Sequence, residues 1–333
     1  MDRVLLGHGS GGRLMHELIR LSFAPSFGLH GLGDAAVLAE EDGGRLALTT
    51  DSYVVSPLFF PGGDIGELAV NGTVNDLAMA GARPLYLTAG FIIEEGFPLE
   101  DLARVVDSMA RAAEAAGVRV VAGDTKVVER GKGDGLYVNT AGVGRVPPGV
   151  RLSPARIRAG DGILVSGPLG RHGVAVMAER TGLAFEPAVL SDTAPLAGLA
   201  DALLSAGGEG VRIMRDPTRG GLATTLKEFA LESALAMRVE EALLPVPPGV
   251  RGACELLGLD PFYVANEGIL VAVVAPDVSE YVLEAVRGHP LGAEAVLAGR
   301  VLEEPGEMVL LATRAGGSRL MDMLEGEQLP RIC

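Results

Sequence analysis

Segments with strand-like and helix-like patterns alternate along this chain, and the alternation restarts after a stretch rich in proline and glycine at residues 145–153. The first half predicts strands at 45–50, 85–93, 119–122 and 137–143, and helices at 65–79 and 99–116, with Gly117 ending the second helix. The second half predicts strands at 162–166, 269–274 and 308–312, and helices at 174–181, 195–206 and 222–235. The repeated alternation predicts two α+β domains of similar size.

The stretch at 145–153 is the expected domain boundary, because proline and glycine cluster where chains turn or link. The expected division is a first domain at 1–149, a second at 150–313 and a flexible tail at 314–333. The tail is polar and glycine-rich, with a short helix predicted at 319–324.

Composition excludes several classes of protein. The 333 residues are 48% hydrophobic, which is enough for a sizeable core and excludes a disordered chain. The formal charge of −15 disfavours binding to nucleic acid and to anionic membranes. No apolar run is long enough to span a membrane, and no signal peptide is visible. With two cysteines there is no disulfide framework, so we expect a reduced cytoplasmic protein.

Acidic residues recur beside small residues or at predicted strand ends in the first domain. They are Asp34, Asp51, Asp76 and Asp124. Any one of them has an ordinary interpretation as a helix cap. Four in one domain favour a second interpretation equally, in which they converge to hold Mg²⁺ together with nucleotide phosphates.

A glycine-rich segment, Gly7–Gly12 (GHGSGG), precedes an amphipathic helix. Its backbone N–H groups are suited to cradling phosphate, although it is neither a Walker A sequence nor a dinucleotide fingerprint. A mobile N-terminal segment explains it equally well, and His8 taken alone is more typical of a solvated residue.

The second domain offers RDPTRGGL at 215–222, directly before a predicted helix. Asp216 or Thr218 would cap that helix, or Arg215 and Arg219 would receive an anion at its N-terminus. Further along, Glu267 (ANEG) precedes a strand, where a solvated glutamate is the more common case.

The two cysteines differ in their setting. Cys254 has helical spacing with Leu257, which predicts a buried core residue. Cys333 is the last residue, where packing gives no reason for a cysteine, so we interpret it as a nucleophile on a swinging tail. About ten extended residues reach roughly 33 Å, enough to carry this sulfur into a cleft between the domains.

Together these motifs resemble the HypE family of hydrogenase maturation proteins, in the PurM-like superfamily of aminoimidazole ribonucleotide synthetase and selenophosphate synthetase. The resemblance covers nearly the whole chain and rests on HGSGG, TTDSYVVSPLFFPGGDIGELAVNGTVNDLAMAGARPLYL, GDTKVV, NTAGVG, RDPTRGGLATTL, ANEG and the terminal PRIC. Only the PRIC ending is specific to HypE. One departure is Ile269, where many members have lysine after ANEG.

The resemblance implies a fold and a reaction. The N-terminal sheet would pair across a homodimer, followed by an α+β C-terminal domain and a mobile tail. A HypF-type carbamoyltransferase would load the terminal cysteine with a carbamoyl group. ATP with Mg²⁺ would then drive its dehydration to thiocyanate, and the cyano group would pass to a HypC–HypD complex for the iron of [NiFe]-hydrogenase.

The resemblance also assigns the site. The metal would be held by Asp34, Asp51, Asp76 and Asp124. The nucleotide would be bound by His8, Gly9, Ser10, Gly11, Gly12, Asp34, Asp51, Asn75, Asp76, Gly123, Asp124, Thr125, Arg215, Asp216, Thr218, Arg219 and Gly220. Cys333 would carry the substrate, with Glu267 and Lys126 removing protons. Lys126 is one of 3 lysines among 28 basic residues, and a desolvated lysine can lose its proton whereas an arginine cannot.

Two alternatives remain open. One is a sister enzyme of the superfamily, a small-molecule kinase or synthetase, which would not need the terminal cysteine. The other is a scaffold that binds nucleotide and partners without chemistry. Deleting Cys333 would leave the activity of a sister enzyme intact and abolish the HypE reaction. ATP turnover that depends on carbamoylated Cys333 would exclude a scaffold.

Overall fold

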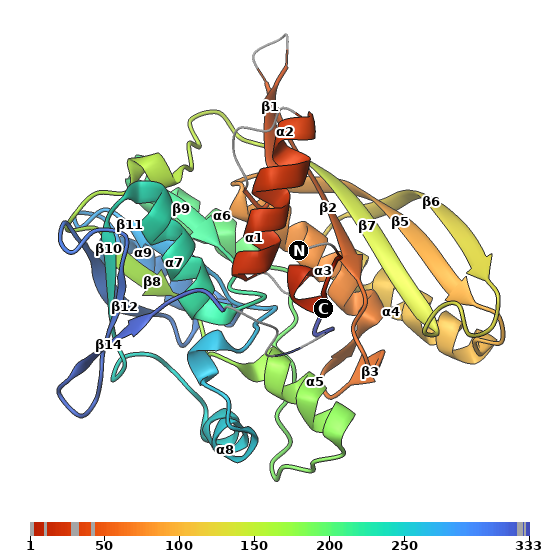
Figure 1. The fold of residues 1–333 in the computed structure, drawn as a ribbon. Coiled ribbons are helices and arrows are strands. Elements are labelled where there is room, and N and C mark those ends of the chain that lie inside the picture. The colour runs from red at the N-terminus through yellow and green to blue at the C-terminus, as the bar shows by residue number, and fades with distance from the viewer. Residues whose placement is uncertain (1–2, 10–11, 28–32, 41–43, 325–328, 330) are drawn as a thin grey trace.

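The computed structural model describes residues 3–9, 12–27, 33–40, 44–324, 329 and 331–333. They form two α+β domains side by side, as the sequence predicts, with the C-terminus between them (Figure 1). No helix in these ranges has the length and apolar character needed to cross a membrane.

The first domain is built on a mixed sheet in the order β1-β2-β7-β5-β6. Its strands are β1 (Ala36–Ala39), β2 (Arg45–Tyr53), β5 (Arg83–Glu94), β6 (Arg119–Val128) and β7 (Leu136–Arg145). Neighbours are antiparallel except β5 and β6, which are parallel and joined through α4 (Leu99–Ala115). As predicted, this helix ends before Gly117, whose φ of +67° suits glycine.

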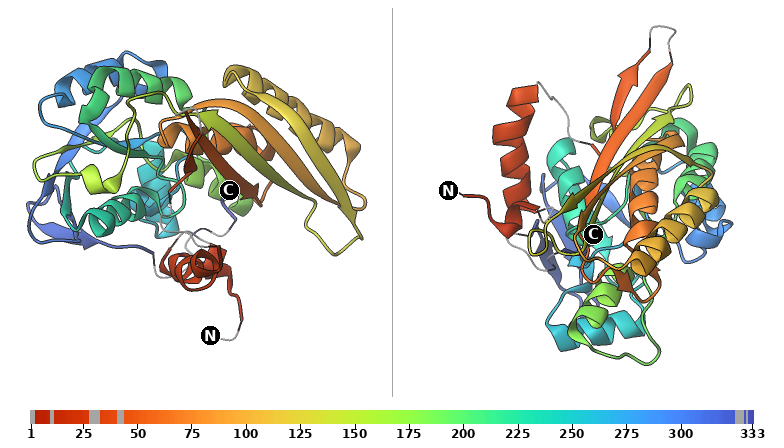
Figure 2. Two further views of the ribbon diagram at one scale, coloured as in Figure 1. Left: turned by 90° about the horizontal axis from the view of Figure 1, so that it is seen from above. Right: turned by 90° about the vertical axis from the view of Figure 1, so that its right-hand side faces the viewer.

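Helix α3 (Ile65–Met79) lies between the sheet and the second domain, as Figure 1 shows. Asp64 starts it by accepting hydrogen bonds from the backbone N–H of Gly66 (2.7 Å) and Glu67 (3.1 Å). Gly66 allows close packing on α4, because a Cβ there would sit 2.3 Å from the Val105 carbonyl oxygen. Helices α3 and α4 cover one face of the sheet and leave the other open (Figure 2).

The second domain is built on a sheet in the order β14-β13-β10-β12-β8-β11-β9. Its strands are β8 (Gly162–Val165), β9 (Val211–Arg215), β10 (Ala236–Glu240), β11 (Val271–Val274), β12 (Val296–Leu302), β13 (Val309–Ala312) and β14 (Ser318–Met321). Along β8, Ile163 and Val165 join one core and Leu164 joins another. The sheet is therefore covered on both faces.

The helices of the second domain pack against the two faces of this sheet. They are α5 (Arg171–Thr181), α6 (Ala197–Gly207), α7 (Gly221–Ser233), α8 (Pro248–Leu257) and α9 (Ser279–Arg287). Phe229 of α7 is buried in the core on one face, and Leu199 of α6 with Val282 of α9 in the core on the other. Cys254 of α8 is buried, as predicted.

The remaining elements are short. They are α1 (Arg13–Leu18), a π-helical turn (Ile19–Phe23), α2 (Ala24–Phe27), the hairpin of β3 (Phe59–Phe60) and β4 (Gly63–Asp64), and 3₁₀ turns at Leu6–Gly9, Pro154–Arg156, Gly208–Gly210, Pro261–Tyr263 and Pro290–Gly292. Helix α1 lies beside α7, where His16 pairs with Glu228, and the C-terminus lies between the two domains (Figure 1).

Three predictions about local structure were wrong. β2 and β6 run on past the expected strand ends, so Asp51 and Asp124 lie within strands. The helix predicted at 319–324 is instead β14, which pairs antiparallel with β13, forms the edge of the sheet and buries Met321. Unpaired edge hydrogen bonds on β13 favour a strand there, and local sequence does not report them. β14 lies inside the segment predicted to be a flexible tail.

Candidate active site

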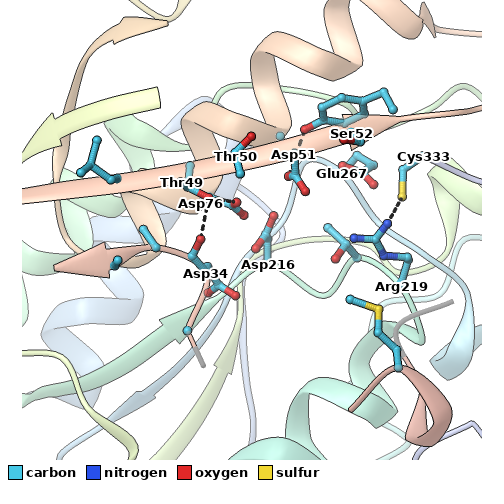
Figure 3. A pocket seen from close by; sticks show the side chains of 18 residues that line it. Asp34, Thr49, Thr50, Asp51, Ser52, Asp76, Asp216, Arg219, Glu267 and Cys333 are labelled. Atoms are coloured by element: carbon cyan, nitrogen blue, oxygen red, sulfur yellow. Dashed lines mark hydrogen bonds between the residues drawn. The ribbon is translucent and has the colours of Figure 1, made fainter. Parts of the chain in front are cut away.

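A cavity of about 560 Å³ opens between the two domains, and acidic side chains converge on it (Figure 3). Its lining includes Asp34, Asp51, Asp76, Asp216, Glu267, Arg219 and Cys333. All seven are residues that the sequence singled out, and they come from segments spread over 300 residues. The gathering of these residues is the main feature that the fold adds to the sequence.

Elements of both domains supply the carboxylates. Asp34 precedes β1, Asp51 lies on β2 and Asp76 on α3, all in the first domain. Asp216 directly follows β9, and Glu267 lies in the loop before β11. The sequence left capping open for Asp216, but the N-cap of α7 is Gly220, with φ +76° and no side-chain cap. Asp216 is therefore available to the cavity.

Burial raises the pKa values of the carboxylates in the cavity, and neighbouring acidic charges raise that of Asp76 further. Burial is the largest cause for Asp51 and Asp76, and each is close enough to affect the other. Burial and the Asp34 charge raise the pKa of Asp216 to about 8. Such a cluster is stabilised by protons or by a cation.

Asp34 belongs to a chain of charges that ties the N-terminal helix to α7. Nε of Arg215 lies 3.2 Å from Asp34, and the same guanidinium pairs with Glu228 of α7. Glu228 also lies 2.9 Å from Nε2 of His16 on α1, which raises the pKa of His16. The charge of Arg215 is thus used to hold the Asp34 carboxylate in place beside the cavity. The sequence had offered this arginine as one that binds an anion directly.

Cys333 presents its sulfur to this cavity. Nη1 of Arg219 lies 3.4 Å from Sγ of Cys333 (Figure 3). Burial nevertheless raises the pKa of the docked thiol to about 12, since desolvation outweighs the guanidinium. The docked cysteine is therefore a protonated thiol, suited to carrying a group rather than attacking one.

Glu267 is buried, and its Oε1 accepts no hydrogen bond from any residue in the described ranges. Burial, Asp216 and Asp192 raise its pKa well above the ordinary value. Asp192 fixes this loop by accepting from the backbone N–H of Glu267 (3.3 Å) and Gly268 (3.2 Å). An unpartnered buried oxygen facing the cavity is available to take a proton from a bound group.

Tyr53 and Thr49 also line the cavity, and the sequence reasoning did not identify them. The Tyr53 hydroxyl donates to Asp51 (3.2 Å), and that of Thr49 to Asp76 (2.7 Å). Gly72 makes room for Tyr53, because a Cβ there would lie 2.1 Å from the hydroxyl oxygen. The β2 alternation that turns Asp51 inward also selects Thr49 and Tyr53, so this signal was present in the sequence.

Gly72→Ala should push the Tyr53 hydroxyl off Asp51 and weaken nucleotide binding, and it should lower the free energy of unfolding by about 1–3 kcal/mol, the usual cost of overpacking. Titration calorimetry with ATP measures the change. Tyr53→Phe removes the clashing oxygen, so the double variant should recover part of the loss. Equal affinities for Gly72→Ala and the parent chain would contradict this role.

Four of the predicted residues that lie outside the cavity lining come from one strand. They are Gly123, Asp124, Thr125 and Lys126 on the edge strand β6, which is exposed along its length apart from its last residue. Lys126 pairs with Asp124 there. Strand register puts Asp124 in one row with Gly90, Asn139 and Ser52, the last of which lines the cavity. At about 4.8 Å per strand, Asp124 is about 14 Å from Ser52.

The described part of the glycine-rich segment, Asn75, Arg215 and Gly220 also lie outside the cavity lining. Nδ1 of His8 accepts from the Leu5 backbone N–H, and Gly12 begins α1 beside Leu324. Ser10 and Gly11 fall outside the described residues. Asn75 is buried and bridges the domains, accepting from the Leu196 N–H (2.7 Å) and donating to the Ala194 carbonyl oxygen (3.1 Å). Its amide holds the cavity walls together.

Residues 32–146 match the family "AIR synthase related protein, N-terminal domain", and residues 158–311 match its C-terminal domain. A protein of Bradyrhizobium diazoefficiens named "Carbamoyl dehydratase HypE" is 56% identical over 98% of this chain and 95% of its own length. The protein of the same name from Escherichia coli is 47% identical over the full length of both chains.

Solved structures agree. A crystal structure of HypE in complex with ATP has a TM-score of 0.84 at 47% identity, covering 99% of this chain and 100% of its own. A crystal structure of a HypE–HypF complex has a TM-score of 0.87 at 47% identity, covering 92% of this chain and 99% of its own. An AaThiL complex with AMPPCP and TMP, at 18% identity and TM-score 0.73, shares the fold. With both domains matched and relatives above 50% identity along its length, this chain belongs to the HypE family of the AIR synthase related proteins.

Proposed function

We propose that this chain is an ATP-dependent carbamoyl dehydratase of [NiFe]-hydrogenase maturation. Its substrate is a carbamoyl group on its own Cys333 sulfur, which it converts to a thiocyanate that supplies cyanide for the iron. The names of the relatives and the ATP complex of a HypE protein support this over a sister kinase or a scaffold.

The observation that carries the proposal is the position of the terminal sulfur. Cys333 lies in the same cavity as Asp51, Asp76 and Asp216. A kinase acting on a free small molecule has no use for a chain terminus there, and a scaffold has no use for an unpartnered buried Glu267. Both features suit chemistry on a group attached to the sulfur.

The reaction needs a better leaving group than amide oxygen. In the first step the carbamoyl oxygen takes the γ-phosphoryl group of ATP and the nitrogen loses one proton, giving S–C(OPO₃)=NH and ADP. In the second step the remaining N–H proton leaves and the C–O bond breaks, giving S–C≡N and phosphate. The site must therefore position ATP and accept two protons.

The donor set suits a magnesium ion. Asp34, Asp51 and Asp76 are hard oxygen ligands whose mutual repulsion a cation would relieve. Among the described residues, no three acidic, histidine or cysteine side chains are already arranged around a metal position. This is the expected pattern for Mg²⁺ that arrives with ATP, because phosphate oxygens and waters complete its shell. Bound there, the ion would neutralise phosphate charge during transfer.

The chain's own groups handle the rest. Arg219 places positive charge beside the sulfur, and Glu267 accepts a proton once bound cations lower its pKa. Lys126, Asp124, His8, Gly9 and Gly12 stay predicted site residues, and a partner or a nucleotide would have to bring them to the cavity. The roles of Ser10 and Gly11 stay predictions as well.

Partners follow from the same chemistry. A HypF-type carbamoyltransferase would load Cys333, in keeping with the HypE–HypF complex, and a HypC–HypD complex would receive the cyano group. A second copy of this chain would cover the open face of the first sheet, where Leu48 of β2 and Ile92 of β5 are exposed. A reduced cytoplasmic setting suits a free catalytic thiol. The divisions at 149/150 and 313/314 stay part of the proposal.

Phosphate release should test the function directly. The chain carbamoylated on Cys333 should release about one phosphate per thiocyanate formed when ATP and Mg²⁺ are added. The uncarbamoylated chain should release phosphate only at background rate, and chelation by EDTA should stop the reaction. Equal phosphate release with and without the carbamoyl group would reject the proposal in favour of a sister activity.

A further inference from the structure

The end of the chain is held in the cavity through its backbone. The carbonyl oxygen of Cys333 accepts from the Val54 N–H (3.1 Å), and that of Arg331 accepts from the Ser56 N–H (3.2 Å). Between them, the Ile332 side chain is buried in the core of the first domain. These contacts leave the sulfur of Cys333 facing the cavity.

Helix α5 of the second domain closes on the same backbone. Nε2 of His172 lies 2.8 Å from the carbonyl oxygen of Ile332. Nη2 of Arg180 donates to the carbonyl oxygen of Arg331 (2.8 Å), and its Nε donates to that of Ser56 (2.7 Å). Two side chains two turns apart on one helix thus capture consecutive tail carbonyls, and Arg180 joins the tail to the strand end beside it.

The hydrogen-bond network fixes which nitrogen of His172 carries the proton. The Ser191 hydroxyl oxygen accepts from the Thr193 N–H (3.1 Å), so its own hydrogen can donate to Nδ1 of His172, 2.9 Å away. Nε2 carries the hydrogen and donates to Ile332, because the carbonyl oxygen of Ile332 can only accept. The ring is fully buried, with the Phe60 ring edge-on at 5.4 Å, and burial lowers its pKa to about 4, so it is neutral near pH 7.

We propose that His172 and Arg180 are positioning residues that dock the C-terminal backbone and thereby bring the carbamoylated sulfur to the nucleotide. The inference rests on the proposed function and adds how the tail is recognised. Because both residues bind main-chain oxygens and not the sulfur, the thiol and its carbamoyl form dock in the same way. Holding the reacting group in place makes the dehydration intramolecular.

Docking can be measured without any reaction, by alkylating the full-length chain with iodoacetamide at pH 7.5. A thiol with a pKa of about 12 is almost unreactive, so label reaches Cys333 mainly when the tail is out. Cys254 on α8 is buried and reports unfolding in the same sample. Peptide mass spectrometry gives the two labelling rates separately.

His172→Phe keeps the bulk of the ring and removes the donor, and Arg180→Met keeps the length of the side chain. Each should raise the Cys333 labelling rate about tenfold while Cys254 labelling stays slow. His172→Gln, whose amide can donate to Ile332, should give a rate nearer that of the parent. In a coupled assay, dehydration should slow in proportion to the docked form that is lost, whereas carbamoyl transfer onto Cys333 should not slow.

Unchanged Cys333 labelling in both His172→Phe and Arg180→Met would overturn the inference. So would labelling of Cys254 that rises in step with that of Cys333 in both variants, since this would show a general loss of stability. Failure of the proposed function looks different. The parent chain would then form no thiocyanate, while the labelling differences between variants would persist.

Discussion

Cys333→Ser should abolish thiocyanate formation and reduce ATP turnover to background, while ATP still binds. The tail docks through backbone carbonyls and through Ile332, so the serine should occupy the same place beside Arg219. An unactivated serine hydroxyl is a far weaker nucleophile than a thiolate, and it provides no sulfur on which a thiocyanate can form. Phosphate release and titration calorimetry with ATP measure the two expectations.

Cys254→Ser is the matched control for this variant. Cys254 is buried in a small core on α8, outside the lining of the cavity that holds Cys333. The change should cost stability through its buried polar group and leave the dehydration rate of folded protein unchanged. Full dehydration by Cys333→Ser, or its loss in correctly folded Cys254→Ser, would show that the wrong sulfur had been identified.

Glu267→Gln should lower the dehydration rate by about 10²- to 10⁴-fold, the usual contribution of a positioned general base. The amide keeps the size of the side chain but cannot accept a proton. Because the pKa of Glu267 is raised, the parent rate should increase with pH as the carboxyl ionises, whereas the variant rate should lack this increase. Single-turnover kinetics with the carbamoylated chain, measured across pH, separate chemistry from nucleotide binding.

Asp161→Asn is the control for burial. Asp161 is as buried as Glu267, but it pairs with Arg212 (3.2 Å) and does not line the cavity. Its loss should lower the melting temperature without changing the rate of the folded protein. If Glu267→Gln turned over at the parent rate, or if both variants slowed equally, the proton-accepting role of Glu267 would have to be abandoned.

The fold was predictable wherever local pattern and tertiary packing agree. Residues 65–79 and 99–116 carry helical spacing, and they form α3 and α4 at almost those bounds. β14 was missed because its strand conformation depends on pairing with β13, a contact formed between separate segments. The short helix predicted at 319–324 is therefore replaced by a strand that pairs at the sheet edge.

Most of the acids predicted for the site could be found in the sequence because each stands in a motif of the family. The sequence could not show the distances between these motifs in the folded chain. Asp51 and Asp76 meet at the cavity, whereas Asp124 lies three strands away on the exposed edge strand. The order of the strands in the sheet sets that separation, and no motif encodes it.

The residues that hold the tail were not found because they carry no chemical signature. His172 and Arg180 lie on an ordinary helix, and their role depends on carbonyl groups more than 150 positions away. Only the folded chain shows that the terminal sulfur is docked by both domains at once.

Mass spectrometry of the C-terminal peptide tests the central claim most directly. The chain is first carbamoylated on Cys333 and then given ATP and Mg²⁺, with a sample lacking ATP alongside. The account predicts that the adduct on Cys333 loses the mass of one water only in the sample with ATP. A carbamoyl adduct that stays intact while ATP is consumed, or that leaves Cys333 without forming a thiocyanate, would contradict it.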